Sequence, residues 1–466
     1  MATNLDKILD KCDILLCFYM CIFVETIRVM KILNFRSAIL SLMASLFPLL
    51  SHAEGIVVSF NDEDGVYRLG DKVVAYVVAD QDMELTCELM EYGTVSISKE
   101  KLSLRKGRKT ILYSARHKTP CHYMFKLSYE GLEKPELAGF IVSPESYRAG
   151  YDCPEDIRNF WDDQMSRMRK VKMETSLARI EDFHSETLEC KDLTVNMHEG
   201  RPVRGYLCMP KDARPQSLPI VIYAHSAGVN KVFNYATTQR AADLAEKGGG
   251  CIVLDINAHG MENGQPQEYY DSLNSGELRG YQNRRITGHE DYYFRLMFLR
   301  LVRALDYLTT LPQWDGRRIL IYGESQGGAQ AMALAGIDER VGACVAIVPA
   351  MNDLGAFKVG RPASWPNVRE SVINDGNVEV VDKVLPYYDA ALLSTMSKAD
   401  YWIEIGLADT TCPAPAIWSA CNVIKGDVRK SAHPFRTHYV PKQPYYDQWK
   451  AICHTGRYEW MNYYLK

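Results

Sequence analysis

The first part of the chain, residues 54–147, alternates hydrophobic and polar side chains with a period of two. That period is typical of strands with one buried and one solvated face. Turn signals rich in glycine and acidic residues separate the runs, and no helical period interrupts them. The predicted strands are residues 72–78, 84–90, 122–129 and 137–142. Together they predict a small all-β sandwich, an accessory domain in which the sequence shows no chemistry.

The pattern changes near Tyr151, where apolar runs and amphipathic stretches begin to alternate. Short runs rich in Val, Ile and Leu predict buried strands, and the longer stretches between them predict helices. The predicted strands are residues 218–223, 251–256, 318–322, 341–348 and 401–405, and the predicted helices begin at Pro154 and cover 235–247, 291–311 and 328–335. This order predicts a mostly parallel sheet covered by helices on both faces over residues 148–466.

Two segments interrupt that order, residues 261–288 and 352–398. Both are rich in tyrosine, proline, asparagine and charge. Long connections of this kind in a compact domain are usually functional. We expect them to form walls or a lid over an active site.

Two apolar stretches precede the sandwich. Residues 14–24 are too few to cross a bilayer. Met30 opens a basic segment that is followed by the apolar run 38–50 and by a small-residue end at Ala53, the three parts of a secretory signal peptide. We therefore expect Met30 to be the true start, residues 1–53 to be a leader, and the mature protein to be secreted or periplasmic. A single membrane anchor formed by the same run is the alternative.

Composition narrows the class of protein. A chain of 466 residues is long enough for two or three domains, and 47% hydrophobic content is that of a folded protein. A net charge of −4 gives no electrostatic reason to expect a nucleic-acid partner. We interpret the basic run 101–109 as a solvated hairpin loop. The thirteen cysteines form no CxxC pair, although Cys87 and Cys121 of the β-rich segment could be bridged.

The stretch Gly323-Glu324-Ser325-Gln326-Gly327 lies between a predicted strand and a predicted helix. A serine held on such a strand-to-helix turn is the nucleophile elbow of an α/β-hydrolase. The new helix also points free N–H groups at a developing oxyanion. The sequence therefore predicts an α/β-hydrolase fold with Ser325 as the nucleophile.

A serine nucleophile needs a base and an acid, which in this fold follow the serine in the order acid, histidine. Asp409 fits the acid because it lies in the turn after the strand 401–405, although it could instead cap the next helix. His454 lies in the C-terminal helical region, a poor place for a base. His433 and His438 both lie beyond the last expected strand, and spacing alone separates them poorly.

The backbone N–H of Ser226, after an early strand, is the expected second oxyanion donor beside that of Gln326. His225 is interpreted as shaping this loop rather than as a base. His259 and His289 raise the question of a metal site, but no ligand spacing supports one. No metal or other cofactor is expected.

Four stretches downstream of residue 154 share their pattern with one enzyme family. They are Pro154-Glu155-Asp156 with Phe160-Trp161, Tyr292-Tyr293-Phe294-Arg295 with Val302-Arg303-Ala304, Gly323-Glu324-Ser325-Gln326-Gly327-Gly328, and Gly406-Leu407-Ala408-Asp409-Thr410-Thr411-Cys412-Pro413. With these motifs about two-thirds of the chain resembles the acetyl xylan esterase / cephalosporin C deacetylase family of carbohydrate esterases.

The resemblance implies the triad Ser325, Asp409 and His438, because the family's catalytic histidine follows a proline by four residues, as His438 follows Pro434. It also implies a serine esterase that needs no cofactor, with acetylated carbohydrate as substrate, and it raises a homo-oligomer as one form of assembly. The family's Arg-Gly-Gln motif reads Asn257-Ala258-His259-Gly260 here, and its His-Glu pair reads His438-Tyr439. The exact substrate stays open.

The leading hypothesis is thus a secreted serine carboxylesterase that removes acetyl groups from carbohydrate. One alternative is a prolyl-oligopeptidase-like or dienelactone-hydrolase-like enzyme that acts on another acyl group. A segment of under a hundred residues is too short for the β-propeller of the former. A non-catalytic glycan-binding protein is a third hypothesis, disfavoured because all three triad residues are present.

Overall fold

The computed structural model describes residues 55–373 and 377–466. The predicted leader, with its start at Met30 and its cleavage after Ala53, lies outside the described residues and stays a prediction. None of the helices in the described part has both the length and the apolar character needed to span a bilayer. Gly55–Lys466 forms one compact unit, and the boundary expected between residues 147 and 148 stays a prediction as well.

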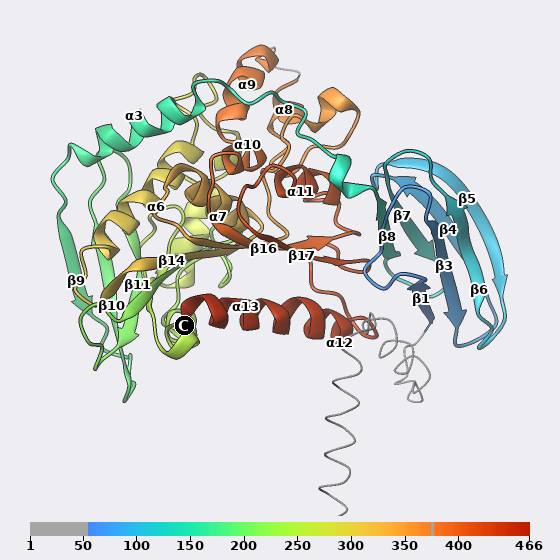
Figure 1. The fold of residues 1–466 in the computed structure, drawn as a ribbon, viewed down its shortest axis with the longest axis horizontal. Coiled ribbons are helices and arrows are strands. Elements are labelled where there is room, and N and C mark those ends of the chain that lie inside the picture. Colours follow the sequence, from blue (N-terminus) through green and yellow to red (C-terminus); the bar gives the residue numbers. More distant parts are fainter. Residues whose placement is uncertain (1–54, 374–376) are drawn as a thin grey trace, which may run out of the picture. The chain divides into compact units, whose positions relative to one another are not determined.

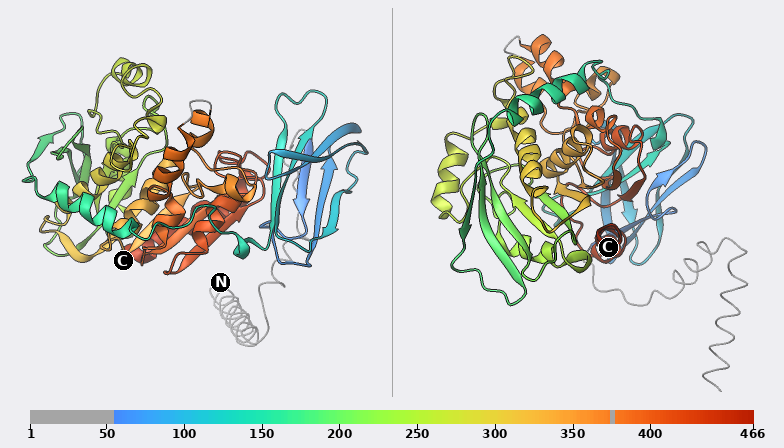
Figure 2. Two further views of the ribbon diagram at one scale, coloured as in Figure 1. Left: turned by 90° about the horizontal axis from the view of Figure 1, so that it is seen from above. Right: turned by 60° about the vertical axis from the view of Figure 1, so that its left-hand side comes forward.

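The β-rich segment folds into two sheets, which we call the sandwich (Figures 1 and 2). The first has the order β1-β3-β6, and its strands are β1 (Ile56–Phe60), β3 (Lys72–Ala79) and β6 (Thr110–Arg116). The second has the order β2-β8-β7-β4-β5, and its strands are β2 (Val66–Tyr67), β4 (Met83–Glu91), β5 (Val95–Leu104), β7 (Cys121–Ser128) and β8 (Glu136–Val142). Alternate residues of both sheets, among them Val77, Leu85 and Phe140, meet in one buried core.

The four strands predicted in this segment are present to within one residue at each end. The predicted loop over residues 101–109 is wrong in its first half, because β5 extends to Leu104. This strand forms an edge of its sheet and is exposed almost throughout. Natural proteins place lysines on such edges to prevent association, so the strand has the composition of a loop.

The bridge considered for Cys87 and Cys121 is not formed, and both thiols are free. In the register of β4 and β7, Cys87 lies opposite Leu127, which is six residues from Cys121. Six residues of strand are about 20 Å, far beyond disulfide reach.

The rest of the chain is built on a nine-stranded sheet with the order β17-β16-β15-β14-β12-β13-β11-β10-β9. Strands β12 to β17 are parallel, as predicted, and β9 to β11 continue the sheet antiparallel. The strands are β9 (Thr175–Arg179), β10 (Leu188–Val195), β11 (Val203–Pro210), β12 (Leu218–Ala224), β13 (Ile252–Ile256), β14 (Trp314–Glu324), β15 (Ala343–Ile347), β16 (Asp400–Gly406) and β17 (Val428–His433).

Helices cover both faces of this sheet (Figure 1). Successive strand residues point to opposite faces, so Ile220 and Ile222 of β12 belong to one core and Val221 to the other. The first face carries α3 (Ile157–Arg169), α6 (Phe294–Leu308), α7 (Gln326–Ile337), α10 (Ala390–Ser394) and α11 (Ala414–Cys421), and the second carries α4 (Thr238–Ala245) and α13 (Gly456–Leu465). The other α-helices of the described residues are α5 (Gln267–Ser275), α8 (Val368–Val372), α9 (Val378–Val384) and α12 (Tyr446–Trp449).

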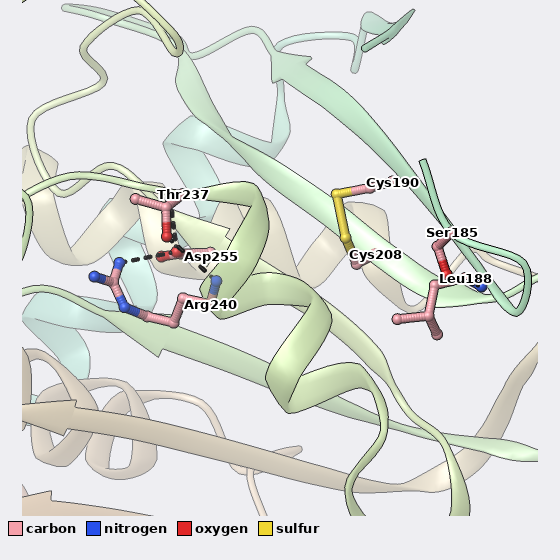
Figure 3. The surroundings of a disulfide bond; sticks show 7 residues. All are labelled: Ser185, Leu188, Cys190, Cys208, Thr237, Arg240 and Asp255. Carbon is pink, nitrogen blue, oxygen red and sulfur yellow. Dashed lines mark hydrogen bonds and ion pairs between the residues drawn. A yellow bond between two sulfur atoms is a disulfide. The ribbon is translucent and has the colours of Figure 1, made fainter. Parts of the chain in front are cut away.

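A disulfide joins Cys190 of β10 to Cys208 of β11 (Figure 3). The two residues are direct partners in the antiparallel register. On β13, which pairs with β11, Asp255 accepts hydrogen bonds from the N–H of Thr237 at 2.9 Å and from Nη1 of Arg240 at 3.0 Å. These bonds fix the start of α4 against the sheet.

Candidate active site

Ser325 stands alone between the end of β14 and the start of α7. Its backbone has φ 56° and ψ −120°, a conformation that L-residues rarely adopt and that the nucleophile elbow imposes. Three backbone hydrogen bonds hold it there. The Ser325 N–H donates to the Ile347 carbonyl at 2.9 Å, and the Ser325 carbonyl accepts the N–H groups of Ala329 and Ala350, each at 3.0 Å. The hydroxyl is therefore presented at the carboxyl end of the parallel strands.

The start of α7 packs closely on the loop of residues 225–228, which we call the oxyanion loop. A Cβ on Gly327 would lie 2.2 Å from the Ala224 carbonyl oxygen, so only glycine permits this approach. Gln326 is the first residue of α7, and its N–H has no partner within the helix. In the described part of the chain the N–H of Ser226 donates to no other group, while its hydroxyl donates to the Glu324 carbonyl at 3.1 Å. Both expected oxyanion donors are thus free.

The acid and the base come from two further loops, the acid loop (residues 407–412) after β16 and the base loop (residues 434–440) after β17. Nε2 of His438 lies 2.9 Å from Oγ of Ser325, and Nδ1 of His438 lies 2.9 Å from Oδ2 of Asp409. The other carboxylate oxygen of Asp409 accepts the N–H groups of Thr411 at 2.8 Å and Cys412 at 3.0 Å. The imidazole is oriented to accept a proton from the serine hydroxyl.

The other late histidines lie elsewhere. Nδ1 of His433 accepts the N–H of Phe435 at 3.3 Å, and burial, with a smaller effect from Arg436, lowers the His433 pKa to about 4. His454 lies in the π-helical segment Lys450–Thr455 and packs on aromatic rings there. Among the histidines near the C-terminus, the structure brings His438 to Ser325.

Two earlier histidines hold the oxyanion loop in place, His225 from within the loop and His259 through a contact with Gly228. His225 is fully buried, with Nε2 2.5 Å from Oδ1 of Asp255. His259 is also fully buried, and its ring nitrogens lie 2.9 Å from the Tyr293 hydroxyl and 3.3 Å from the Gly228 carbonyl oxygen. Burial lowers the His259 pKa to about 3, so this ring stays neutral.

One group of possible metal ligands exists among the described residues, Asp409, Cys412 and His438, whose ligand atoms lie within 4.8 Å of one another. Burial, with a contribution from Asp409, raises the Cys412 pKa well above its usual range and keeps the thiol protonated. Metals bind the thiolate, and the other two side chains already bond to each other. The donor set therefore fits a Ser-His-Asp arrangement better than a metal.

Tyr281, which the sequence did not single out, links the oxyanion loop to the side chain of Gln326. Its hydroxyl accepts the N–H of Gly228 at 3.3 Å and donates to the side-chain carbonyl of Gln326. Burial raises the Tyr281 pKa, so the phenol keeps its proton. The residue belongs to the inserted segment 261–288, whose tyrosine content was the signal that could have pointed to it.

A cavity of about 480 Å³ opens beside the oxyanion loop. Ala227 and Gly228 form one side, residues 274–282 of the first inserted segment form another, and Trp365 of the second closes it. Trp365 also lines a cavity of about 650 Å³ that reaches Thr410 and Thr411 of the acid loop. Both inserted segments therefore contribute walls close to the loops of the site.

Comparisons with known proteins bear on the family and the fold of the chain. The model of the acetyl xylan esterase family matches residues 137–452. A relative, the acetyl esterase Axe7A of Xylanibacter ruminicola, is 26% identical over 398 residues, which are 83% of this chain and 88% of that protein.

Two solved structures share the fold. The acetyl xylan esterase from Paenibacillus sp. R4 has a TM-score of 0.56 and 23% identity, covering 68% of this chain and 98% of its own. Acetyl xylan esterase 1 from Thermoanaerobacterium sp. JW/SL YS485 has a TM-score of 0.52 and 22% identity, covering 66% and 96%. Because the family match spans more than half of the chain, the protein belongs to the acetyl xylan esterase family and is, as predicted, a carboxylic ester hydrolase with the α/β-hydrolase fold.

Proposed function

We propose that the protein is an extracytoplasmic serine esterase that removes acetyl groups from acetylated xylan or its oligosaccharides through the triad Ser325, His438 and Asp409. The observation that carries the proposal is the continuous contact from Ser325 Oγ through both imidazole nitrogens of His438 to Asp409, with each step 2.9 Å long. The family supplies the chemical class, an acetyl esterase acting on carbohydrate.

In the first half of the reaction, Ser325 Oγ attacks the acetyl carbonyl carbon while His438 Nε2 takes the hydroxyl proton. The charge on the carbonyl oxygen is stabilised by the N–H groups of Ser226 and Gln326. Asp409 accepts the Nδ1–H of His438 and stabilises the imidazolium. The tetrahedral intermediate collapses, His438 returns its proton to the departing sugar hydroxyl, and the acetyl group stays on Ser325.

In the second half, a water molecule gives its proton to His438 and attacks the acetyl-enzyme. The same two N–H groups stabilise the second oxyanion, and the proton returns to Ser325 as acetate leaves. Every proton is handled by His438, so no cofactor takes part in these steps.

The cavity beside the oxyanion loop supports a sugar as the alcohol part of the ester. It combines the indole of Trp365 with polar side chains that can bond hydroxyl groups. Those polar side chains are Asn274, Ser275, Arg279 and Gln282. The signal-peptide pattern that ends at Ala53 supports a location where a plant polysaccharide would be met.

The test is hydrolysis of p-nitrophenyl acetate, butyrate and octanoate by the wild type and Ser325→Ala. We expect a strong preference for acetate and a loss of kcat by several orders of magnitude in the variant. Acetate release from acetylated xylo-oligosaccharides then tests the substrate. Activity that survives in Ser325→Ala would overturn the triad, and a preference for long acyl chains or for peptides would favour the other α/β-hydrolase activities.

A further inference from the structure

The acid and base loops bond to each other, because the Ala408 N–H donates to the Arg436 carbonyl at 3.0 Å. Each loop also forms a hydrogen bond with the sandwich. The family match begins at residue 137, so β1 to β7 lie outside it, and the family does not supply their role.

The contact to the acid loop is made by His122 of β7. Its Nε2 lies 2.8 Å from the Leu407 carbonyl oxygen, two residues before Asp409. Because a carbonyl only accepts, Nε2 must carry the proton. Complete burial lowers the His122 pKa to about 4, so the ring is neutral and Nδ1 carries no proton. Nδ1 has no hydrogen-bond partner in the described part of the chain. Within the same part, the Leu407 oxygen accepts no other hydrogen bond.

The contact to the base loop is made by β8, where the Gly139 N–H donates to the Pro434 carbonyl at 2.8 Å. A Cβ on Gly139 would lie 1.9 Å from the Leu407 carbonyl oxygen. Glycine is therefore the residue that allows this strand to lie against both loops at once.

The base loop also inserts a side chain into the sandwich. Phe435 belongs to the sandwich core, with its ring centroid 5.9 Å from that of Phe60. On its other side Tyr445 stacks at 3.7 Å with an interplanar angle of 11°. The Tyr445 hydroxyl accepts the N–H of Val58 of β1 at 2.7 Å. His438 is three residues from this anchored ring.

We propose that the sandwich is a positioning element of the active site, which fixes Asp409 and His438 through its contacts with Leu407, Pro434 and Phe435. The proposal rests on the proposed triad. It requires that a small displacement of Asp409 and His438 lowers kcat, as expected when reacting groups must be held in a near-attack geometry. A glycan-binding face would instead expose aromatic rings, whereas the large apolar side chains exposed on the described sandwich are aliphatic, namely Leu69, Val95, Ile97 and Ile111.

The experiment measures kcat and KM for p-nitrophenyl acetate in full-length variants, with enzyme concentration corrected for the folded fraction. His122→Leu removes the donor to Leu407 and should lower kcat at least tenfold while KM stays within twofold. His122→Gln places an amide N–H near the same position and should restore kcat to within threefold. Phe60→Leu is a mild change that disturbs the contact with Phe435 and should lower kcat about threefold. This variant tests the proposal if His122→Leu does not fold.

Val77→Ala is the matched control, since Val77 is fully buried in the same core but bonds to neither loop. It should lower Tm and leave kcat unchanged. Wild-type kcat in folded His122→Leu and Phe60→Leu, or an equal loss in Val77→Ala, would overturn the positioning role. Ser325→Ala is assayed alongside, because residual activity there would contradict the proposed triad itself rather than the role of the sandwich.

Discussion

Arg436 and Glu404 form an ion pair in the interior, with Nε of the arginine 2.9 Å from Oε1 of the glutamate and both side chains shielded from solvent. Arg436 lies two residues before His438, and Glu404 lies on β16, the strand that leads to the acid loop. Nη2 of the same guanidinium donates at 3.0 Å to the carboxylate of Glu324, directly before Ser325. One cation therefore joins the three segments that carry the proposed triad.

Replacing Arg436 by methionine should strongly destabilise the protein. The change leaves Glu404 buried with a reduced set of partners, and loss of one member of a buried pair costs about 3 kcal/mol or more. Urea unfolding followed by fluorescence measures the change. Arg369→Met is the control, because the Arg369–Asp382 pair is partly exposed and should be worth less than about 1 kcal/mol. Equal losses in the two variants would contradict the importance of the buried pair.

Tyr281→Phe should lower kcat about tenfold with little change in KM. The Tyr281 hydroxyl ties the oxyanion loop to Gln326. Removing one oxyanion donor lowers kcat a hundredfold or more, and we expect a smaller loss when the donors are only held less firmly. Steady-state hydrolysis of p-nitrophenyl acetate measures both constants. Tyr463→Phe is the control, since that ring is 84% exposed. A rise in KM at constant kcat would assign Tyr281 to substrate binding instead.

The neutral state of His122 predicts a dependence of stability on pH. Its pKa is about 4 in the folded protein and near 6.5 when unfolded, so between these values the unfolded chain binds more protons. The stabilisation that depends on the neutral His122 ring is therefore fully present above pH 6.5 and is lost as the pH falls toward 4. This one group accounts for a loss on the order of 3 kcal/mol.

Urea unfolding at pH 7.0 and pH 4.5 of the wild type and His122→Gln isolates that contribution. The variant lacks the titrating group and should lose less stability between the two pH values, although it can start from a lower value at pH 7.0. Identical pH dependence in the two proteins would show that His122 does not titrate in this range.

The periodic elements of this protein and two of the proposed triad residues follow from local sequence, whereas the contacts that support them do not. The alternating pattern of β3 and the apolar runs of the parallel strands predict these elements correctly, because burial of one or both strand faces determines which positions are hydrophobic. Ser325 and Asp409 each follow a strand, and that order placed them. His438 was separated from His433 by the family pattern rather than by spacing.

Contacts between distant segments could not be predicted in this way. His122 and Leu407 are 285 positions apart, and Arg436 and Glu324 are 112 apart. Their pairing depends on how the whole chain packs. The sequence nevertheless carries a signal for the second pair. Glu324 precedes Ser325 directly and Arg436 lies two residues before His438, and opposite charges this near two groups that must meet favour an ion pair.

The disulfide between Cys190 and Cys208 should contribute stability but not activity. It closes a loop with a sequence separation of 18, for which the loss of unfolded-state entropy is worth about 3 kcal/mol. The Cys190→Ser, Cys208→Ser double variant should show a lower Tm, unaffected by reductant, and wild-type kcat. Cys153→Ser removes an exposed free thiol and should behave as wild type. A loss of kcat in the double variant at a temperature where it is folded would contradict a purely stabilising role.

Tyr439 follows His438 directly, and its ring is 78% exposed beside that imidazole, at a centroid distance of 6.0 Å. We expect an aromatic ring left open to solvent next to the proposed base to pack against the sugar of the proposed substrate. Such a contact is worth about 1 kcal/mol, or roughly fivefold in affinity. Tyr439→Ala should therefore raise KM for acetylated xylo-oligosaccharides several-fold and leave both constants for p-nitrophenyl acetate unchanged, since that ester has no sugar. Tyr463→Ala, an equally exposed ring on α13, should change neither substrate. Equal effects on both esters would instead mean that Tyr439 acts on His438 itself.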